Sequence, residues 1–117
     1  MLKDLGRLLR KIRIDHGEIL QNMADRFGVT ASYLSAVENG KRPIPGAWER
    51  IILENYPLDE KQRGELRKAV IESTETINLD MKGSGFDTKE VAFSFARKIN
   101  ELPDDKLLEI KRILGGD

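Results

Sequence analysis

The tripeptide Gly28-Val29-Thr30 separates two short segments with helical apolar spacing, and its residue types suit an exposed helix start. Glycine tolerates the positive φ at which helices often end, and threonine is a favourable N-cap. A short cap leaves the first backbone N–H groups of the next helix accessible, where the helix dipole favours an anion such as phosphate. Two short helices joined by a tight glycine-containing turn form a helix-turn-helix candidate, whose second helix can enter the major groove of duplex DNA.

The other residues that could do chemistry form no catalytic or metal-binding pattern. His16 is the only histidine and the chain has no cysteine, so spacing typical of metal ligands is missing. We expect His16 at the surface, at a helix end. Asp104 and Asp105 are adjacent and point apart on a helix, so capping a helix start is the better interpretation. With no phosphate-binding loop and no nucleophile beside a base, we expect no enzyme, no cofactor and no metal.

Apolar residues recur at helical spacing through the first half of the chain, which predicts an all-α fold. Gly17 ends the first stripe, Gly28 the second, and Asn39-Gly40 terminates the third. A loop with two prolines follows, and then a helix over about 47–55 with Trp48 in the core. Asp59 caps a fifth helix that reaches about residue 73. The stripes that define these helices are Leu5, Leu8, Leu9 and Ile12; Leu20, Met23, Ala24 and Phe27; Leu34 and Val37; Trp48, Ile51 and Ile52; and Leu66, Ala69 and Val70.

The last third of the chain has a different pattern. Thr76–Met81 alternates polar and apolar residues, which is the period of a strand, although an extended linker fits the same pattern. Residues 82–85 form a flexible connector. Asp87 or Thr88 is expected to cap a sixth helix to about Glu101. A seventh helix starts at residues 103–104, with Leu107, Ile110 and Leu114 at helical spacing. We therefore predict two segments, 1–73 and 74–117.

Charge is distributed unevenly although its sum is zero. Residues 1–50 hold nine Lys or Arg and six Asp or Glu, a balance of +3, and residues 51–117 hold eleven and fourteen, a balance of −3. The sign favours a DNA surface in the first half. No apolar run approaches the roughly 18 residues of a membrane span, and the first residues lack the apolar core of a signal peptide. We expect a cytoplasmic protein without a membrane partner.

The run MADRFGVTASYLSAVENGKRP, residues 23–43, resembles the Xre/Cro/phage-repressor family. That family's pattern has an alanine in the first motif helix, a glycine in the turn, a Tyr-Leu-Ser stretch and a Glu-Asn-Gly-Lys-Arg ending. With the flanking helices, the resemblance covers residues 1–70. It implies a five-helix lambda-repressor-like DNA-binding domain.

The resemblance also implies roles for matching positions. Arg13 and Glu38 would form a partly buried ion pair that ties the first helix to the recognition helix. The base-facing positions would be Ala31, Ser32 and Ala36, with Ser35 beside them; those near phosphate would be Tyr33, Asn39 and Lys41, with Arg42 next to them. Thr30, at the start of the second motif helix, is expected near phosphate on the helix-start argument above.

Two positions depart from the family pattern. Leu20 stands where relatives often have a glutamine that binds phosphate, so either Gln21 makes that contact or it is absent. The recognition helix has alanine where relatives often have glutamine or arginine. Alanine can contact a thymine methyl group but cannot make a bidentate hydrogen-bonded pair. We therefore expect shape and phosphate contacts to carry more of the discrimination between sequences.

A single helix-turn-helix makes few base contacts, and family members bind pseudo-palindromic operators as dimers, with half-sites about 34 Å apart. We expect residues 74–117 to hold two copies of the chain together as a homodimer. The alternative is that they fold back on their own domain. A lone strand would expose unpaired backbone groups that a second copy could satisfy. The candidate dimerisation residues are Ile77, Leu79 and Met81 in the strand-like segment and Val91, Phe93 and Phe95 in the sixth helix.

These observations favour a dimeric, sequence-specific regulator of transcription that binds a double-stranded DNA operator, as phage or prophage repressors do. Two alternatives stay open. One is an antitoxin that binds a toxin through its C-terminal part and DNA through its N-terminal part. The other is a protein-interaction adaptor on a helix-turn-helix scaffold. In each case a regulatory partner protein is a possible ligand.

Overall fold

In a computed structural model that describes residues 4–115, the chain is all-helical, which confirms the predicted fold class. It divides into two compact units, Met1–Asn78 and Leu79–Asp117. We call them the first and second units; residues 1–3 and 116–117 of the two predicted segments lie outside the described range. No helix between residues 4 and 115 has both the length and the apolar character needed to cross a membrane.

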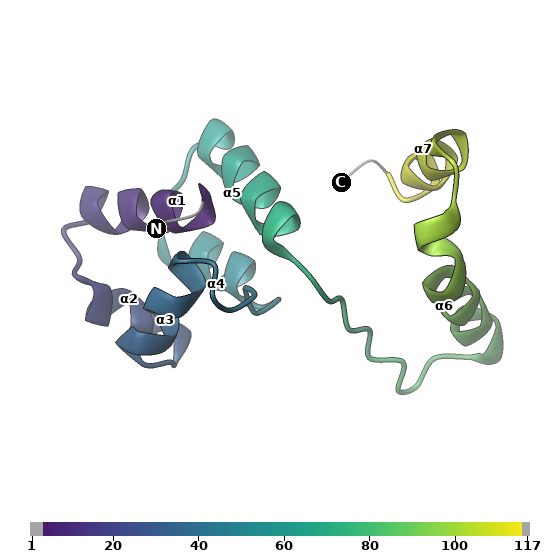
Figure 1. The fold of residues 1–117 in the computed structure, drawn as a ribbon, viewed down its shortest axis with the longest axis horizontal. Helices are drawn as coiled ribbons and strands as arrows, with labels where there is room; N and C mark the ends of the chain where they lie inside the picture. Colours follow the sequence, from purple (N-terminus) through teal and green to yellow (C-terminus); the bar gives the residue numbers. More distant parts are fainter. Residues whose placement is uncertain (1–3, 116–117) are drawn as a thin grey trace. The chain divides into compact units, whose positions relative to one another are not determined.

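The first unit is built from helices that pack across one another (Figure 1). Helix α1 packs on α3 and α5, α2 packs on α3 and α4, and α4 packs on α5. The helix that the sequence predicts over 47–55 begins at Trp48. The elements are α1 (Asp4–Asp15), α2 (Leu20–Phe27), α3 (Ala31–Glu38), α4 (Trp48–Asn55) and α5 (Glu60–Ser73).

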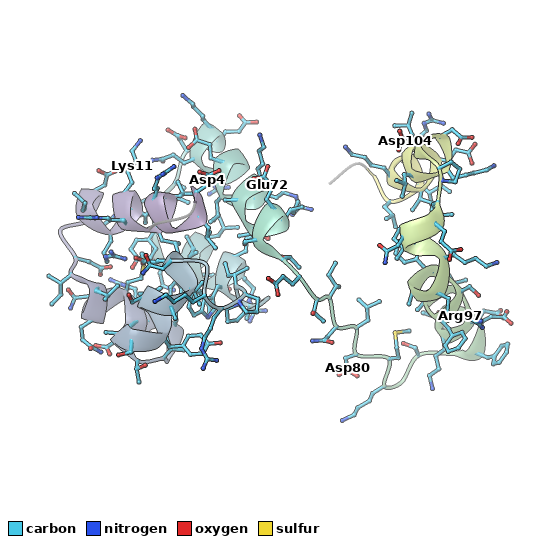
Figure 2. All side chains as sticks on the ribbon, viewed as in Figure 1. Asp4, Lys11, Glu72, Asp80, Arg97 and Asp104 are labelled. Atoms are coloured by element: carbon cyan, nitrogen blue, oxygen red, sulfur yellow. The ribbon has the colours of Figure 1, made fainter. Side chains whose placement is uncertain are left out.

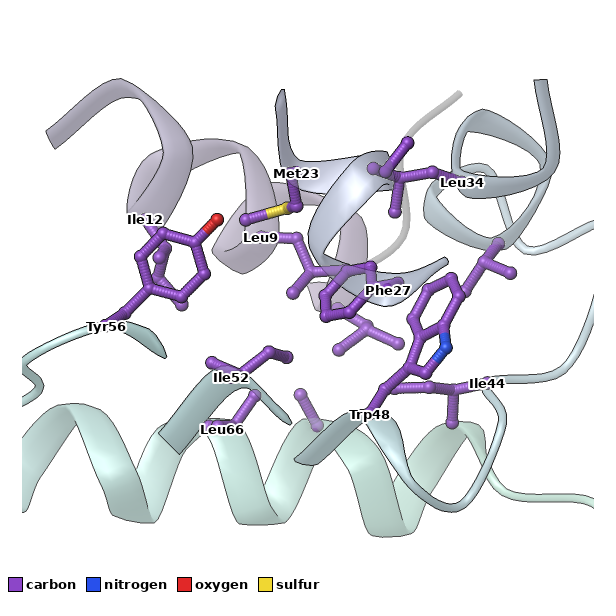
Figure 3. Close-up of a cluster of buried hydrophobic side chains, with 14 of the residues drawn as sticks. Leu9, Ile12, Met23, Phe27, Leu34, Ile44, Trp48, Ile52, Tyr56 and Leu66 are labelled. Carbon is purple, nitrogen blue, oxygen red and sulfur yellow. The ribbon is translucent and has the colours of Figure 1, made fainter. Parts of the chain in front are cut away.

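One apolar core holds these helices together (Figure 3). Most of the predicted stripe residues are buried in it, whereas Leu8, Leu20, Ile51 and Val70 pack against it half-buried. Three buried residues that the stripes did not include, Ile44, Tyr56 and Leu58, complete the core. Leu9, Leu34 and Ile52 are fully buried and come from three different helices. Phe27 stacks on Trp48, with ring centroids 4.2 Å apart and planes 10° from parallel. The core placement predicted for Trp48 is confirmed, since this side chain is only 2% exposed.

Helix ends in the first unit follow local sequence signals. The backbone N–H of Gly28 donates to the carbonyl of Asp25, and that of Val29 donates to Ala24, at 3.1 and 3.0 Å. This is a Schellman ending, which needs positive φ, and Gly28 has φ of 70°. The Asp59 carboxylate accepts from the backbone N–H of Gln62 at 2.8 Å, which confirms the predicted cap of α5.

Helix α1 crosses the end of α3 at very short range, and Gly6 is the residue that permits it. A Cβ atom placed on Gly6 would lie 2.1 Å from the Glu38 carbonyl oxygen, far closer than any real contact. Because Gly6 has no Cβ atom, α3 can lie this close to α1. The sequence shows only a glycine inside a helical pattern, and the carbonyl group that requires it lies in another helix.

The second unit contains α6 (Phe86–Lys98), a 3₁₀ turn η1 (Ile99–Glu101) and α7 (Asp104–Ile113). The predicted cap of α6 was wrong: Gly85 is the N-cap and the helix starts at Phe86, so Asp87 lies in the first turn, where the helix dipole also favours it. The predicted helix to Glu101 ends at Lys98, with η1 completing it.

The strand-like segment pairs with no other strand within residues 4–115, so the predicted strand is not confirmed. Residues 74–81 are extended but have no ladder partner among residues 4–115, so the alternating pattern corresponds here to an extended connection. Ile77 and Leu79 are 79% and 65% exposed. The alternating pattern is compatible with a paired strand and with an unpaired extended linker. A period of two residues therefore could not distinguish these two predictions.

Candidate nucleic-acid interface

Helices α2 and α3 are joined by the turn Gly28-Val29-Thr30, and the turn fixes how α3 begins. Thr30 has extended backbone angles, and its hydroxyl oxygen accepts a hydrogen bond from the Tyr33 backbone N–H at 3.1 Å. The Thr30 hydroxyl group still has its own proton to donate. Since the first N–H groups of a helix have no intrahelical acceptor, the start of α3 presents donors to an anion.

The face of α3 that the resemblance assigns to bases is lined by small side chains. Ser32 is exposed, and Ala31, Ser35 and Ala36 are half-buried. Among the larger side chains of α3, Leu34, Val37 and Glu38 are buried and Tyr33 is half-buried. A surface of methyl and hydroxyl groups can approach another surface closely. Its hydrogen bonds come from short side chains that stay near the helix, and not from long ones that extend away from it.

Arg13 and Glu38 meet in the structure as a buried pair between α1 and α3. Arg13 Nη1 donates to Glu38 Oε2 at 2.5 Å and Nη2 donates to Oε1 at 3.4 Å. Their side chains are 9% and 5% exposed. Arg13 Nη1 also lies 3.7 Å from the Met23 sulfur, which adds α2 to the contact. The pair neutralises a carboxylate at the end of α3 that would otherwise repel an anionic ligand.

Two cations lie beside α3, and the fold fixes the backbone of the first. The Lys41 backbone N–H donates to the carbonyl of Ala36 at 2.8 Å, and Gly40, with φ of 74°, donates to Val37. This second Schellman ending attaches Lys41 directly to the end of α3. The Lys41 side chain is exposed.

Arg42 is placed by aromatic packing. Its guanidinium lies 5.0 Å from the centre of the Tyr33 ring, and Tyr33 lies 6.0 Å from the buried Trp48 ring. Tyr33 is half-buried, so it supports Arg42 from the core side. A guanidinium stacked by its face keeps its edge N–H groups available for a bidentate contact with phosphate.

Two of the predicted phosphate-facing amides are engaged within the protein. Asn39 Nδ2 donates to the Ser35 carbonyl at 2.8 Å, so this side chain closes the end of α3. Gln21 Nε2 donates to Asp25 Oδ1 at 2.8 Å. Gln21 is exposed, but a contact with phosphate would have to compete with this carboxylate, which itself adds negative charge to α2.

A polar cluster that the sequence analysis missed joins the start of α2 to the end of α4. Arg26 Nη2 lies 2.6 Å from Glu18 Oε2, and the Tyr56 hydroxyl donates to Glu18 Oε1. Arg26 Nη1 also donates to Asn55 Oδ1 at 3.1 Å. His16 packs edge-on against Tyr56 at 5.1 Å. The cluster ties the segment before α2 and the last turn of α2 to the end of α4. No local spacing could reveal a pairing across 38 positions.

The electrostatics of this cluster are set by its central carboxylate. The hydrogen bond from Arg26 lowers the pKa of Glu18 below its ordinary value, with burial acting against it and Tyr56 adding to the lowering. Burial raises the pKa of the Tyr56 hydroxyl, and the neighbouring Glu18 carboxylate raises it further. Both pKa shifts favour an ionised Glu18 beside a neutral Tyr56.

The predicted dimerisation residues do not belong to this site. Ile77 lies in the extended segment of the first unit, whereas the others lie in the second unit. Val91 and Phe93 are 69% and 64% exposed, Phe95 is 39% exposed, and Met81 is half-buried.

Comparison with known proteins gives no relative to support the site: no protein-family model matches the chain, and neither the curated proteins nor the solved structures searched give a match.

Proposed function

We propose that the chain is a sequence-specific regulator of transcription of the phage or prophage repressor type, which binds duplex DNA with α3 in the major groove. The observation that carries the proposal is the combination at α3 of a capped, accessible start, a face of small side chains and two cations from the segment that follows the helix. A helix without large projecting side chains fits the major groove closely, and the turn after α2 is short enough to place both helices on one duplex.

Recognition of bases rests on the small face of α3. The hydroxyl of Ser32 can donate to or accept from a base edge. The Ser35 hydroxyl oxygen lies 3.4 Å from Asn39 Nδ2, and this hydroxyl group keeps its own proton to donate. The methyl groups of Ala31 and Ala36 can contact thymine methyl groups. None of these contacts is a bidentate pair, so a large share of the sequence preference comes from groove shape and DNA deformability.

Binding to the backbone rests on few charges. Lys41, Arg42 and the start of α3 with Thr30 form the phosphate-binding groups, and Asp25 opposes them. Each neutralised phosphate adds about −0.9 to the slope of log K against log salt, so two cations predict a shallow slope of about −2 for each copy. The affinity for DNA therefore depends more on the close fit of α3 in the groove than on long-range attraction between the protein and the phosphates.

The test is a titration of the full chain against a duplex selected from a random pool, with single charge changes in matched positions. Lys41→Glu places a negative charge at the proposed phosphate contact, and we expect binding to fall at least tenfold. Lys11→Glu makes the same change on the side of α1 that faces away from α2 and α3 in Figure 2, and it should leave binding within about twofold.

A second variant tests the small face directly. Ser32→Glu puts a carboxylate in the first turn of α3, where the helix dipole tolerates it, so the fold should be kept. The proposal predicts that this variant loses binding to the selected duplex. Equal effects of Lys41→Glu and Lys11→Glu, or full binding by Ser32→Glu, would remove α3 from the interface and favour the adaptor alternative.

A further inference from the structure

Helix α1 carries an exposed cation, Arg10, that has no place in the interface described above. Its guanidinium forms no ion pair with a carboxylate among residues 4–115. Two other arginines of this helix do form pairs: Arg7 lies 3.3 Å from Asp4, and Arg13 is buried against Glu38. The charge of Arg10 is therefore available to a ligand, and its position on α1 decides which ligand it can reach.

Arg10 lies on the side of α1 that crosses α3. It comes four residues after Gly6 and three before Arg13, so these three residues are neighbours on one side of the helix. Both neighbours meet the end of α3: a Cβ on Gly6 would collide with the Glu38 carbonyl oxygen, and Arg13 Nη2 donates to Glu38 Oε1 at 3.4 Å. Arg10 is therefore next to the place where the two helices touch.

The order of residues around α1 puts Arg10 on the outer side of this crossing. With about 3.6 residues per turn, the core residues Leu9 and Ile12 are followed around the helix by Gly6 and Arg13, and then by Arg10. The first four are buried and Arg10 is exposed. Arg10 is thus farther from the core than the residues that touch α3.

The same order holds around α3. Its core residues are Leu34 and Val37, Glu38 comes next, and Ser35 and Ser32 follow on the side away from the core. On both helices, the side of the crossing that faces away from the core is therefore the outer one, and on α3 it is the small face proposed to meet bases. A duplex that lies against this face passes next to Arg10.

Lys41 belongs to the same helix end. Its backbone N–H donates to the Ala36 carbonyl at 2.8 Å, so the chain folds back over the last turn of α3. Two cations from different elements, Arg10 on α1 and Lys41 after α3, therefore lie next to the end of α3. The Glu38 carboxylate at this end is already neutralised by Arg13 and does not cancel their charge.

We propose that Arg10 binds a backbone phosphate of the duplex, beside the phosphate bound by Lys41. A guanidinium can make two parallel hydrogen bonds to one phosphate, which an ammonium group cannot. Such a contact fixes the orientation of α3 in the groove and carries no sequence information itself. The inference rests on the proposed function. It adds a third cation to Lys41 and Arg42, which steepens the slope of log K against log salt from about −2 to about −3 for each copy.

The experiment measures the affinity of the full chain for the selected duplex, and for a duplex of scrambled sequence, over a range of salt concentrations. Arg10→Ala should weaken binding to both duplexes and make the slope shallower by about 0.9. Raising the salt about fourfold then costs this variant roughly three times less affinity than it costs the parent protein. Arg10→Lys keeps the charge but loses the paired hydrogen bonds, so it should weaken binding and keep the parent slope.

Lys11→Ala is the matched control. It removes the same charge from the next position, on the side of α1 that faces away from α2 and α3 in Figure 2, and it should keep the parent slope. Equal changes of slope in Arg10→Ala and Lys11→Ala would show a response to net charge alone and would overturn the contact. Unchanged fluorescence of Trp48, the only tryptophan and a buried core residue, shows that each variant has kept the first unit folded.

Lys41→Ala separates this inference from the proposed function. If Lys41→Ala makes the slope shallower and Arg10→Ala does not, the Arg10 contact is wrong and the interface at α3 stands. If neither variant changes the slope, the interface at α3 is wrong as well. Shallower slopes in both variants, with the parent slope in Lys11→Ala, are the result that we expect.

Discussion

The two units of this chain use similar helices in opposite ways. In the first unit, helices α1 to α5 turn apolar side chains toward one core. In the second unit, the helices turn apolar residues outward and bury none. Amphipathic periodicity therefore predicts the helices of both units equally well. It does not show whether the apolar face of a helix is covered by the same chain or by another one.

The largest expected contrast concerns ion pairs. Glu38→Ala leaves Arg13 buried without its partner, and breaking a buried pair in this way costs about 3–5 kcal/mol. Glu109→Ala in the second unit removes only an exposed pair with Lys106 at 3.8 Å, and it should cost about 0.5 kcal/mol or less. Urea unfolding followed by Trp48 fluorescence and by circular dichroism measures both. Similar costs for the two variants would contradict the role given to the Arg13–Glu38 pair.

Truncation of apolar side chains gives the next contrast. Ile52 is fully buried, and Ile52→Ala should destabilise the first unit by about 2–5 kcal/mol. Ile113 is 81% exposed, and Ile113→Ala should leave the unfolding of the first unit unchanged while it weakens self-association. Thermal melts at two protein concentrations separate these effects. A concentration-independent melt of the second-unit signal would argue against an intermolecular core.

The close crossing of α1 and α3 predicts a smaller loss. Gly6→Ala puts a methyl group against the Glu38 carbonyl, and overpacking of this kind typically costs about 1–3 kcal/mol. Gly64→Ala is the matched control, since a Cβ there meets nothing within 4 Å, and alanine should stabilise α5. If Gly6→Ala proves as stable as the parent protein, α1 must lie farther from α3 than described.

The smallest effect is the pH dependence of the Glu18 cluster. The folded state lowers the pKa of Glu18, so its contribution is fully present above the unfolded value of 4.5 and is lost as pH falls through the lower folded value. Glu18→Gln should therefore reduce stability at pH 7 more than at pH 3. Tyr56→Phe removes one hydrogen bond, at a cost of about 1 kcal/mol. Melting temperatures of both variants between pH 3 and pH 7 test these expectations. If Glu18→Gln loses the same stability at every pH, ionised Glu18 is not the stabilising form.

The sequence predicted most of the first unit because its signals are local. The helix ends depend on residues that contact only their near neighbours in the sequence, namely Gly28, Thr30, Gly40 and Asp59. The apolar stripes follow directly from helical geometry. The resemblance also implied the contact between Arg13 and Glu38, which no local rule gives.

What the sequence did not predict depends on distant or competing contacts. Gly6 matters because of a backbone carbonyl in another helix, and Tyr56 because of a carboxylate 38 positions away. Asn39 and Gln21 were expected to face phosphate, but neighbouring acceptors bind their amides in the free protein. Residues 74–81 alternate as a strand does, yet no partner strand is present among residues 4–115 to make them one.

Selection of bound duplexes from a pool of random DNA at two salt concentrations tests whether α3 reads a specific DNA sequence. We expect enrichment of a two-part palindrome that persists at the higher salt, because close fit rather than bulk charge carries the affinity. A single enriched half-site would support recognition by α3 and contradict the dimer. Weak, unselective retention that disappears at the higher salt would contradict sequence-specific recognition by α3.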